Sequence, residues 1–291
     1  MRYLLIIILA YPLALVLGQE STHTYVKKIL QEGYTVQSLV QQKLNQQINL
    51  SLQAVQKDFN IDPHVWSIVM QAANNKIQAI NAKHDFVMAT KRNHLVPFFE
   101  PDKTIKKQIL KAHIPPSCVC IEYDINPSVI CDVDFNEKTQ SYVLTFNKEI
   151  AENLPKNYLR AITHHEATHI RYGDCLKLKF VENLLLCLGH KQEKITSRRS
   201  WQHLNYAIEE RADQLPVLIS SKTAQDMQQF MEEVVFDSSN LYNQKNYTNG
   251  QHHPSPFQRL MGVKRVASYL DIEKEIKHRD EYNKSCGALE A

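Results

Sequence analysis

The residues best suited to chemistry are two histidines and a glutamate near the middle of the chain. His165, Glu166 and His169 form the pattern H-E-x-x-H within the tract HHEATHIRYGD, residues 164–174. On an α-helix, residues i and i+4 lie one above the other, so the two histidines can direct their imidazoles at a single metal ion. Glu166 lies about 100° around such a helix, where a carboxylate can take a proton from a water on the ion. The pattern therefore predicts a metal site that activates water.

A catalytic zinc ion takes three protein ligands, so a third ligand must come from elsewhere in the chain. The tract does not continue as a metzincin motif, because Tyr172 and Cys175 stand where that motif requires glycine and histidine. A second tract, AIEERAD at 207–213, places Glu209 and Asp213 one helical turn apart on the same side. We expect Glu209 to bind the ion and Asp213 to accept the spare N–H of a ligand histidine. Taken alone, this tract is more typical of a solvated acidic stripe.

A third tract, HHPSPFQRL at 252–260, places His253 and Pro254 ahead of Arg259. By itself it is typical of a polar loop that opens a helix. In this order the three tracts resemble the HtpX and CAAX-prenyl-endopeptidase type of zinc peptidase (metallopeptidase family forty-eight, gluzincins). The motifs of that family are H-E-x-x-H, E-x-x-A-D and H-P-x-x-x-x-R. The resemblance covers roughly residues 140–270 and does not reach the N-terminal helices.

The resemblance implies a zinc metalloendopeptidase with one zinc ion per chain. By the family pattern, the ion would be bound by His165, His169 and Glu209. Glu166 would be the general base, taking a proton from the attacking water and passing it to the leaving amine. Asp213 would support a ligand histidine from behind.

The resemblance also implies how substrate is held. His253 and Arg259 would lie near the cleft, as catalytic residues that help to stabilise the oxyanion. In gluzincins a strand beside the H-E-x-x-H helix binds extended substrate, and Tyr142–Phe146 is the natural candidate because it lies just upstream of that helix. We therefore expect a protein or peptide substrate, in unfolded or misassembled exported proteins.

The surrounding sequence predicts the elements that must position these residues. Apolar residues recur at helical spacing before residue 112 and again from Leu154 onward. Turn residues separate three strand-like runs, Cys118–Asp124, Val129–Phe135 and Tyr142–Phe146. We therefore predict a mainly α-helical (α+β) fold: a gluzincin-like helical metalloprotease domain with a small antiparallel sheet, preceded by N-terminal helices. One helix is expected to start at Pro63, with Asp62 as its N-cap.

The N-terminus has the pattern of a secretory signal. A basic Met1-Arg2 precedes an apolar run over residues 3–17, and Gly18 provides a small residue for cleavage. The run is short for a membrane span, so we expect membrane attachment only if the segment stays uncleaved as an anchor. The predicted organisation is a signal peptide at 1–18, an N-terminal helical region at 19–112 and a zinc metallopeptidase domain at 113–291. The protein is expected to be exported, either periplasmic or secreted.

The composition argues against some classes of binding partner. The 34 Lys and Arg exceed the 31 Asp and Glu by too little to indicate a nucleic-acid groove. Only seven glycines occur, and neither of the common glycine-rich nucleotide motifs is present, so no nucleotide partner and no cofactor besides zinc is predicted. Six cysteines fit an exported protein, but their spacing leaves the disulfide pairing open.

Two other interpretations stay open at the level of sequence. The protein could be a metal-binding but non-proteolytic module, chaperone-like or partner-binding, in which His253 or His164 fills the open position on the ion. It could also be a secreted helical interaction protein in which all three tracts are incidental. That last interpretation predicts that His165 lies far from Glu209, so a three-dimensional structure can test it.

Overall fold

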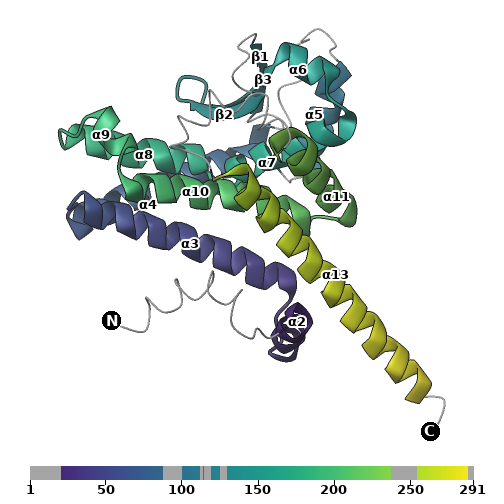
Figure 1. Ribbon diagram of the computed structural model, residues 1–291. Coiled ribbons are helices and arrows are strands. Elements are labelled where there is room, and N and C mark those ends of the chain that lie inside the picture. Colours follow the sequence, from purple (N-terminus) through teal and green to yellow (C-terminus); the bar gives the residue numbers. More distant parts are fainter. Residues whose placement is uncertain are drawn as a thin grey trace. The chain divides into compact units, whose positions relative to one another are not determined.

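We analysed a computed structural model, which describes residues 21–87, 100–111, 114, 119–124, 130–236 and 254–287. Helices make up 78% of the described residues and accompany one three-stranded sheet (Figure 1), so the prediction of a mainly helical chain with a small sheet is confirmed. The predicted signal peptide, residues 1–18, lies outside the described residues. No helix in the described part of the chain is long and apolar enough to cross a bilayer.

The chain forms two compact units. Of the described residues, 21–41 and 265–287 make up the smaller unit, which contains α2 (Thr22–Gln31). There the rings of Tyr25 and Tyr269 lie 5.8 Å apart, over a small core that includes Val26, Ile29, Val36, Val40 and Val266. The remaining described residues, from 42 to 264, form the larger unit, which holds all three chemical tracts. The predicted domain boundary after residue 112 stays a prediction.

Helices α3 (Val36–Asp58), α4 (Pro63–Val87) and α5 (Glu100–Lys111) make up the helical region before the sheet. The predicted start of α4 is confirmed. Asp62 Oδ1 accepts hydrogen bonds from the backbone N–H groups of His64 at 2.9 Å and Val65 at 3.1 Å. One hydrophobic core joins this region to later helices, through Ile48, Val55, Trp66, Leu185, Trp201 and Leu204 among others.

The small sheet is present, but its strand directions differ from the prediction. Its order is β1 (Val119–Asp124), β3 (Ser141–Asn147), β2 (Cys131–Asn136), so β3 lies in the centre. A short turn joins β2 to β3 and makes that pair antiparallel, whereas β1 runs parallel to β3. The expected all-antiparallel sheet is therefore corrected to a mixed one. Alternating hydrophobicity is the same for a strand in either direction, so the sequence pattern carried no information about this difference.

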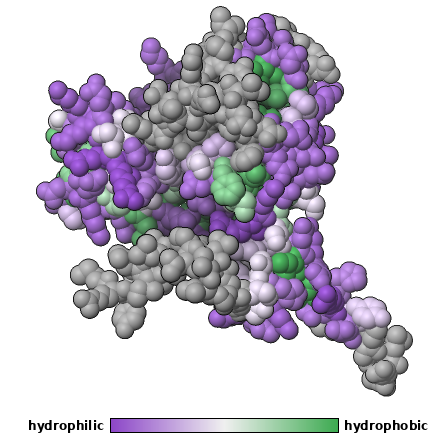
Figure 2. Space-filling view, in the orientation of Figure 1, coloured by the Kyte–Doolittle hydropathy of each residue, from purple (hydrophilic) through white to green (hydrophobic). Residues whose placement is uncertain are grey.

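Several elements of the larger unit pack around one helix, α7 (Lys156–Tyr172). It contacts β2, α5, α8, α10 and α11, and almost all of its second half is buried (Figure 1). The H-E-x-x-H tract therefore lies inside the protein and not on a surface helix. On the face drawn in Figure 2, most of the described surface is hydrophilic, and apolar residues form small separate patches. The other helices are α6 (Lys148–Asn153), α8 (Asp174–Cys187), α9 (Gln192–Thr196), α10 (Arg199–Gln214), η2 (Leu215–Leu218), α11 (Ser221–Phe230), η3 (Met231–Phe236) and α13 (Pro256–Gly287).

Gly173 allows α7 to end and α8 to begin at the next residue. Its φ of 65° lies in the left-handed region, which favours glycine at a helix C-terminus. A Cβ atom at this position would also lie 2.4 Å from Ile77 Cδ1 on α4. Because Gly173 ends α7 and precedes α8, Asp174 is the first residue of α8 and lies next to the last turn of α7.

We predict that Gly173→Ala destabilises the protein more than Gly189→Ala. Gly189 also has a positive φ, of 85°, but nothing lies within 4 Å of where its Cβ would be. That control should therefore lose only the left-handed strain of about 1–2 kcal/mol, while Gly173→Ala adds the clash with Ile77. Denaturant unfolding of both variants measures the difference, and equal losses would contradict the packing argument.

Candidate metal centre

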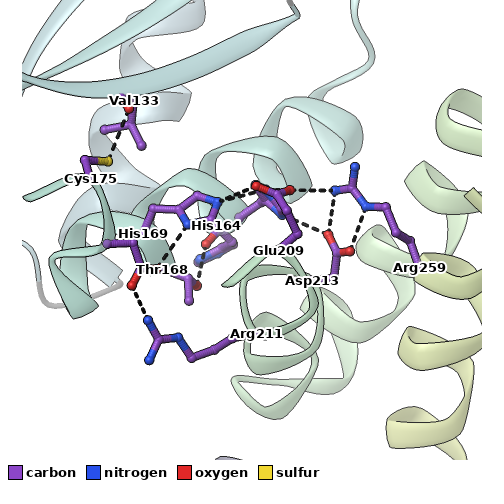
Figure 3. Close-up of polar contacts among 11 residues, drawn as sticks. Val133, His164, Thr168, His169, Cys175, Glu209, Arg211, Asp213 and Arg259 are labelled. Carbon is purple, nitrogen blue, oxygen red and sulfur yellow. Dashed lines mark hydrogen bonds and ion pairs between the residues drawn. The ribbon is translucent and has the colours of Figure 1, made fainter. Parts of the chain in front are cut away.

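The structure brings His165, His169 and Glu209 together, although Glu209 lies 40 positions after the second histidine in the sequence. The two imidazole Nε2 atoms lie 3.2 Å apart. One carboxylate oxygen of Glu209 is 3.4 Å from His165 Nε2, and the other is 3.6 Å from His169 Nε2. Figure 3 shows Glu209 reaching from α10 toward the histidines of α7. The interpretation that the tracts are incidental, which required His165 to lie far from Glu209, is therefore wrong.

His165 is held from behind by a carboxylate. Its Nδ1 lies 2.9 Å from Asp213 Oδ1, on the same face of α10 as Glu209. Asp213 in turn forms a two-pronged ion pair with Arg259 of α13, with both N···O distances at 2.7 Å (Figure 3). Asp213 thus lies behind His165, as the sequence predicted, and it also accepts hydrogen bonds from the guanidinium of Arg259.

His169 has an equivalent support that sequence reasoning missed. Its Nδ1 lies 3.1 Å from Asp174 Oδ2, and the other Asp174 oxygen pairs with Arg211 Nη2. Asp174 closes the same tract that contains H-E-x-x-H, five residues after His169. The available signal was an acidic residue directly after a glycine that can end a helix, because a new helix starting there would lie next to the last turn of the old one.

Each imidazole thus directs Nδ1 at a carboxylate and Nε2 at the other imidazole. In the neutral form with its proton on the Nδ1 that faces the carboxylate, each imidazole presents the lone pair of Nε2 to the same small space, and Glu209 presents its oxygens there too. A cation is the partner that satisfies three such acceptors at once, and both imidazoles already carry the carboxylate support typical of metal-ligating histidines. The chemistry of the donor set therefore fits a metal ion.

The electrostatics of the group follow from its burial and its carboxylates. Burial lowers the pKa of His165, but hydrogen bonds and charge from Asp213 and Glu209 outweigh it and raise the pKa to about 10. Burial also opposes the charged form of His169, while Asp174 and Glu209 raise its pKa above the ordinary value. Burial likewise opposes ionisation of Asp213, yet Arg259 and His165 hold its pKa below the usual range.

Glu166 is buried on α7 next to the two histidines. Burial raises the pKa of its carboxyl group, and the charges of His165 and His169 lower it in part. Its electrostatic coupling to both histidines and to Glu209 places it beside the His-His-Glu group. The structure assigns it no ion-pair partner within the described residues.

The two remaining predicted residues have different outcomes. His253 lies outside the described residues. Arg259 lies at the site, but its guanidinium is engaged with carboxylates, since it pairs with Asp213 and also lies 3.7 Å from Glu209. His164, which could have filled an open position on an ion, instead places its Nε2 3.2 Å from Gln108 of α5.

Comparisons of the chain with protein-family models, with curated proteins and with solved structures found no match. What the structure itself shows is a mostly buried His-His-Glu group that could hold a metal ion in a mainly helical protein.

We predict that metal binding releases protons at pH 7. A histidine binds a metal ion only when the coordinating nitrogen is deprotonated, and a pKa of about 10 keeps His165 protonated at pH 7 in the metal-free protein. Apparent Zn²⁺ affinity should therefore rise between pH 6 and pH 8, by about tenfold per pH unit for each proton displaced. Calorimetry in two buffers with different heats of protonation counts the protons.

Asp213→Asn is the matched variant, because it removes the carboxylate that raises the His165 pKa. It should release fewer protons at the same pH, although it binds metal more weakly. Zn²⁺ binding without proton release, at an affinity that does not change between pH 6 and pH 8, would contradict the raised pKa values of the two histidines.

Proposed function

We propose that the protein is a zinc-dependent endopeptidase that hydrolyses peptide bonds with Glu166 as general base. The observation that carries the proposal is the convergence of His165, His169 and Glu209 from two helices, with the Glu166 carboxyl group buried beside them. The same arrangement is what the resemblance to the gluzincin peptidases implies for these four residues.

The donor set and its spacing favour zinc. Two imidazole nitrogens and one carboxylate form one of the known catalytic zinc ligand sets. Tetrahedral coordination with bonds of 2.0–2.1 Å requires neighbouring ligand atoms about 3.3–3.4 Å apart. The Nε2 atoms are 3.2 Å apart, and the nearest oxygens of Glu209 lie at 3.4 and 3.6 Å from them. These two distances involve different oxygens of Glu209; with one ligand atom taken from each residue, all three atoms lie within 4.8 Å of one another, which is close enough to surround a single ion.

The chemistry divides between the ion and the chain. A bound zinc ion would polarise the scissile carbonyl and make water more acidic. Glu166 accepts the proton of the attacking water and gives it to the leaving amine; burial suits it to both steps because it moves the carboxyl pKa toward neutrality. Asp213 and Asp174 hold the two imidazoles in one tautomer. We assign Arg259 a positioning role through Asp213, in place of the oxyanion role that the sequence suggested.

We propose a different substrate-binding strand from the one that the sequence suggested. Tyr142–Phe146 lies in β3, whose two edges are already paired with β1 and β2. Among the described strands, β2 has an open edge on the side of α7 and α8, so we assign substrate pairing to β2. Burial raises the pKa of Cys131 well above its ordinary value and the charge of Glu166 raises it further, so the first residues of β2 lie near Glu166.

The hydrogen-bond pattern shows which backbone groups of β2 point to that edge. Asn147 N–H donates to Ile130 O, so the antiparallel register turns the peptide groups of Cys131, Val133 and Phe135 away from β3. Two outward carbonyls are already used, because Cys175 Sγ contacts Val133 O at 3.2 Å and Lys179 Nζ contacts Phe135 O at 3.3 Å.

The outward N–H of Phe135 is also used, since it donates to Asp134 Oδ1. Among the described residues, no partner contacts the backbone of Cys131 or the N–H of Val133. Extended substrate therefore pairs with the first half of β2, next to Glu166. This pairing recognises backbone and not side chains, which suits unfolded or misassembled proteins as substrates.

We further propose that the protein is exported, on the basis of its signal-like residues 1–18, and that its partner is a protein or peptide substrate and no nucleic acid or nucleotide. The competing proposal is a metal-binding module without proteolysis. In that proposal, His253 or His164 would fill the open position on the ion, but His164 contacts Gln108 instead.

The experiment that tests the proposal is Glu166→Gln. We expect the variant to bind one zinc ion per chain as the wild type does, and to lose peptide hydrolysis by about 10²–10⁴-fold because no base remains. Metal analysis and cleavage of an unfolded protein such as casein measure the two properties. Glu210→Gln, which removes the carboxylate next to the ligand on α10, is the control and should keep both. Wild-type turnover in Glu166→Gln would refute the assigned base.

The assignment of β2 predicts opposite outcomes for two proline substitutions. Val133→Pro removes an N–H that points to the open edge, so it should leave the protein folded and raise KM for extended peptides about 3–10-fold per lost hydrogen bond. Asp134→Pro removes an N–H that faces β3, so it should destabilise the sheet. Peptide kinetics and thermal unfolding distinguish them, and an unchanged KM in folded Val133→Pro would exclude this edge.

A further inference from the structure

One hydrogen bond connects the N-terminal helical region to the metal centre. Asn45 lies on α3, outside the part of the sequence that resembles a peptidase. Its Oδ1 accepts a hydrogen bond of 3.0 Å from Arg211 Nη1 on α10. Arg211 lies between Glu209 and Asp213 in sequence, but its side chain takes a different direction from theirs (Figure 3).

From Arg211 the polar contacts continue to His169, a predicted metal ligand. Arg211 Nη2 pairs with one oxygen of Asp174, and the other oxygen of Asp174 lies 3.1 Å from His169 Nδ1. Asn45, Arg211 and Asp174 therefore form a continuous polar chain that ends on the imidazole of His169. Each member comes from a different helix, namely α3, α10 and α8.

Burial means that members of this polar chain need hydrogen-bond partners within the protein. Arg211 is 2% exposed and Asp174 is 1% exposed, so neither can satisfy its polar atoms with bulk water. The Nε of Arg211 has no hydrogen-bond partner among the described residues, and the guanidinium also lies over the ring of Tyr172, 4.1 Å from its centre. Asn45 thus supplies one of the few hydrogen bonds that fix the plane of this guanidinium.

The two histidines are supported from different parts of the chain. His165 depends on Asp213 and Arg259, which comes from α13 in the C-terminal part. His169 depends on Asp174 and Arg211, and on α3 through Asn45. The N-terminal helices therefore have a direct route to one half of the site.

We propose that Asn45 is a positioning residue for the metal site, through which the N-terminal helical region orients His169 by way of Arg211 and Asp174. The inference rests on the proposed binding of zinc by His165, His169 and Glu209. It gives α3 a role in metal binding that the peptidase-like part of the sequence does not contain. Asn45 touches neither ion nor substrate, so it acts through Arg211 alone.

The test measures metal affinity and ligand geometry and does not depend on turnover. Asn45→Leu keeps the size of the side chain and removes the acceptor, and we expect Zn²⁺ affinity to fall about tenfold, the lower end for residues that support a metal ligand. Competition with a chromophoric chelator measures the affinity, and the visible spectrum of the Co²⁺-loaded protein reports a change in the histidine ligands. Asn45→Asp retains the acceptor and should bind both ions like the wild type.

Gln46→Leu is the matched control, because Gln46 is the exposed neighbour of Asn45 on α3. It should change neither the affinity nor the spectrum. A double-mutant cycle then shows whether Asn45 acts through Arg211: in an Arg211→Met background, Asn45→Leu should cause no further loss of affinity. Because the cycle compares variants that share Arg211→Met, it holds even if the single variants differ in stability.

The outcomes separate this inference from the proposed function. If wild-type protein binds neither Zn²⁺ nor Co²⁺, the metal site itself fails. If the wild type binds both ions and Asn45→Leu binds them equally well with the same Co²⁺ spectrum, only the role of Asn45 is overturned. A loss as large in Gln46→Leu, or a full tenfold further loss in the Arg211→Met background, would also overturn it.

Discussion

The structure depends on neutralising several charged side chains that are buried on α7 and on the helices next to it. Two imidazoles with raised pKa values and the carboxylates of Asp213 and Asp174 are buried, and the carboxylate of Glu209 beside them is partly buried. Such a group is stable only if each charge meets an opposite one at hydrogen-bond distance. The ion pairs of Asp213 with Arg259 and of Asp174 with Arg211 meet that requirement. The space between the imidazoles is where a divalent cation completes the balance.

This requirement explains why so many elements meet at one helix. α7 carries both histidines, α10 brings Glu209, Asp213 and Arg211, α8 begins with Asp174, and α13 brings Arg259. The left-handed Gly173 is what allows α8 to begin close enough for Asp174 to reach His169. The histidines, Glu209 and the residues that support them thus come from four helices, so the site forms only when the larger unit is folded. The carboxylates of Asp213 and Asp174 orient the two imidazoles in this site.

In the proposed enzyme, the sheet next to α7 binds substrate, whereas the helices position the metal ligands. Its central strand, β3, is buried and satisfied on both edges, while β2 presents backbone groups toward the site. Side chains of α8 and Asp134 already occupy the second half of that edge, which is a common way to protect a sheet from unwanted pairing. Within the described part of the chain, the backbone of Cys131 and the N–H of Val133 remain for the extended substrate that we propose. In the proposed enzyme, recognition and chemistry therefore meet at the start of β2.

Much of this could be predicted from local sequence, because local pattern has direct physical consequences. The four-residue spacing of His165 and His169 on a helix, the spacing of Glu209 and Asp213, and the N-cap at Asp62 all depend on geometry within one turn. Contacts between distant segments did not follow from any such pattern. The engagement of Arg259 by Asp213, the parallel direction of β1 and the contact of Asn45 with Arg211 depend on how helices and strands pack. Packing is decided by the burial of whole faces and the neutralisation of buried charge, which are properties of the folded chain and not of any one segment.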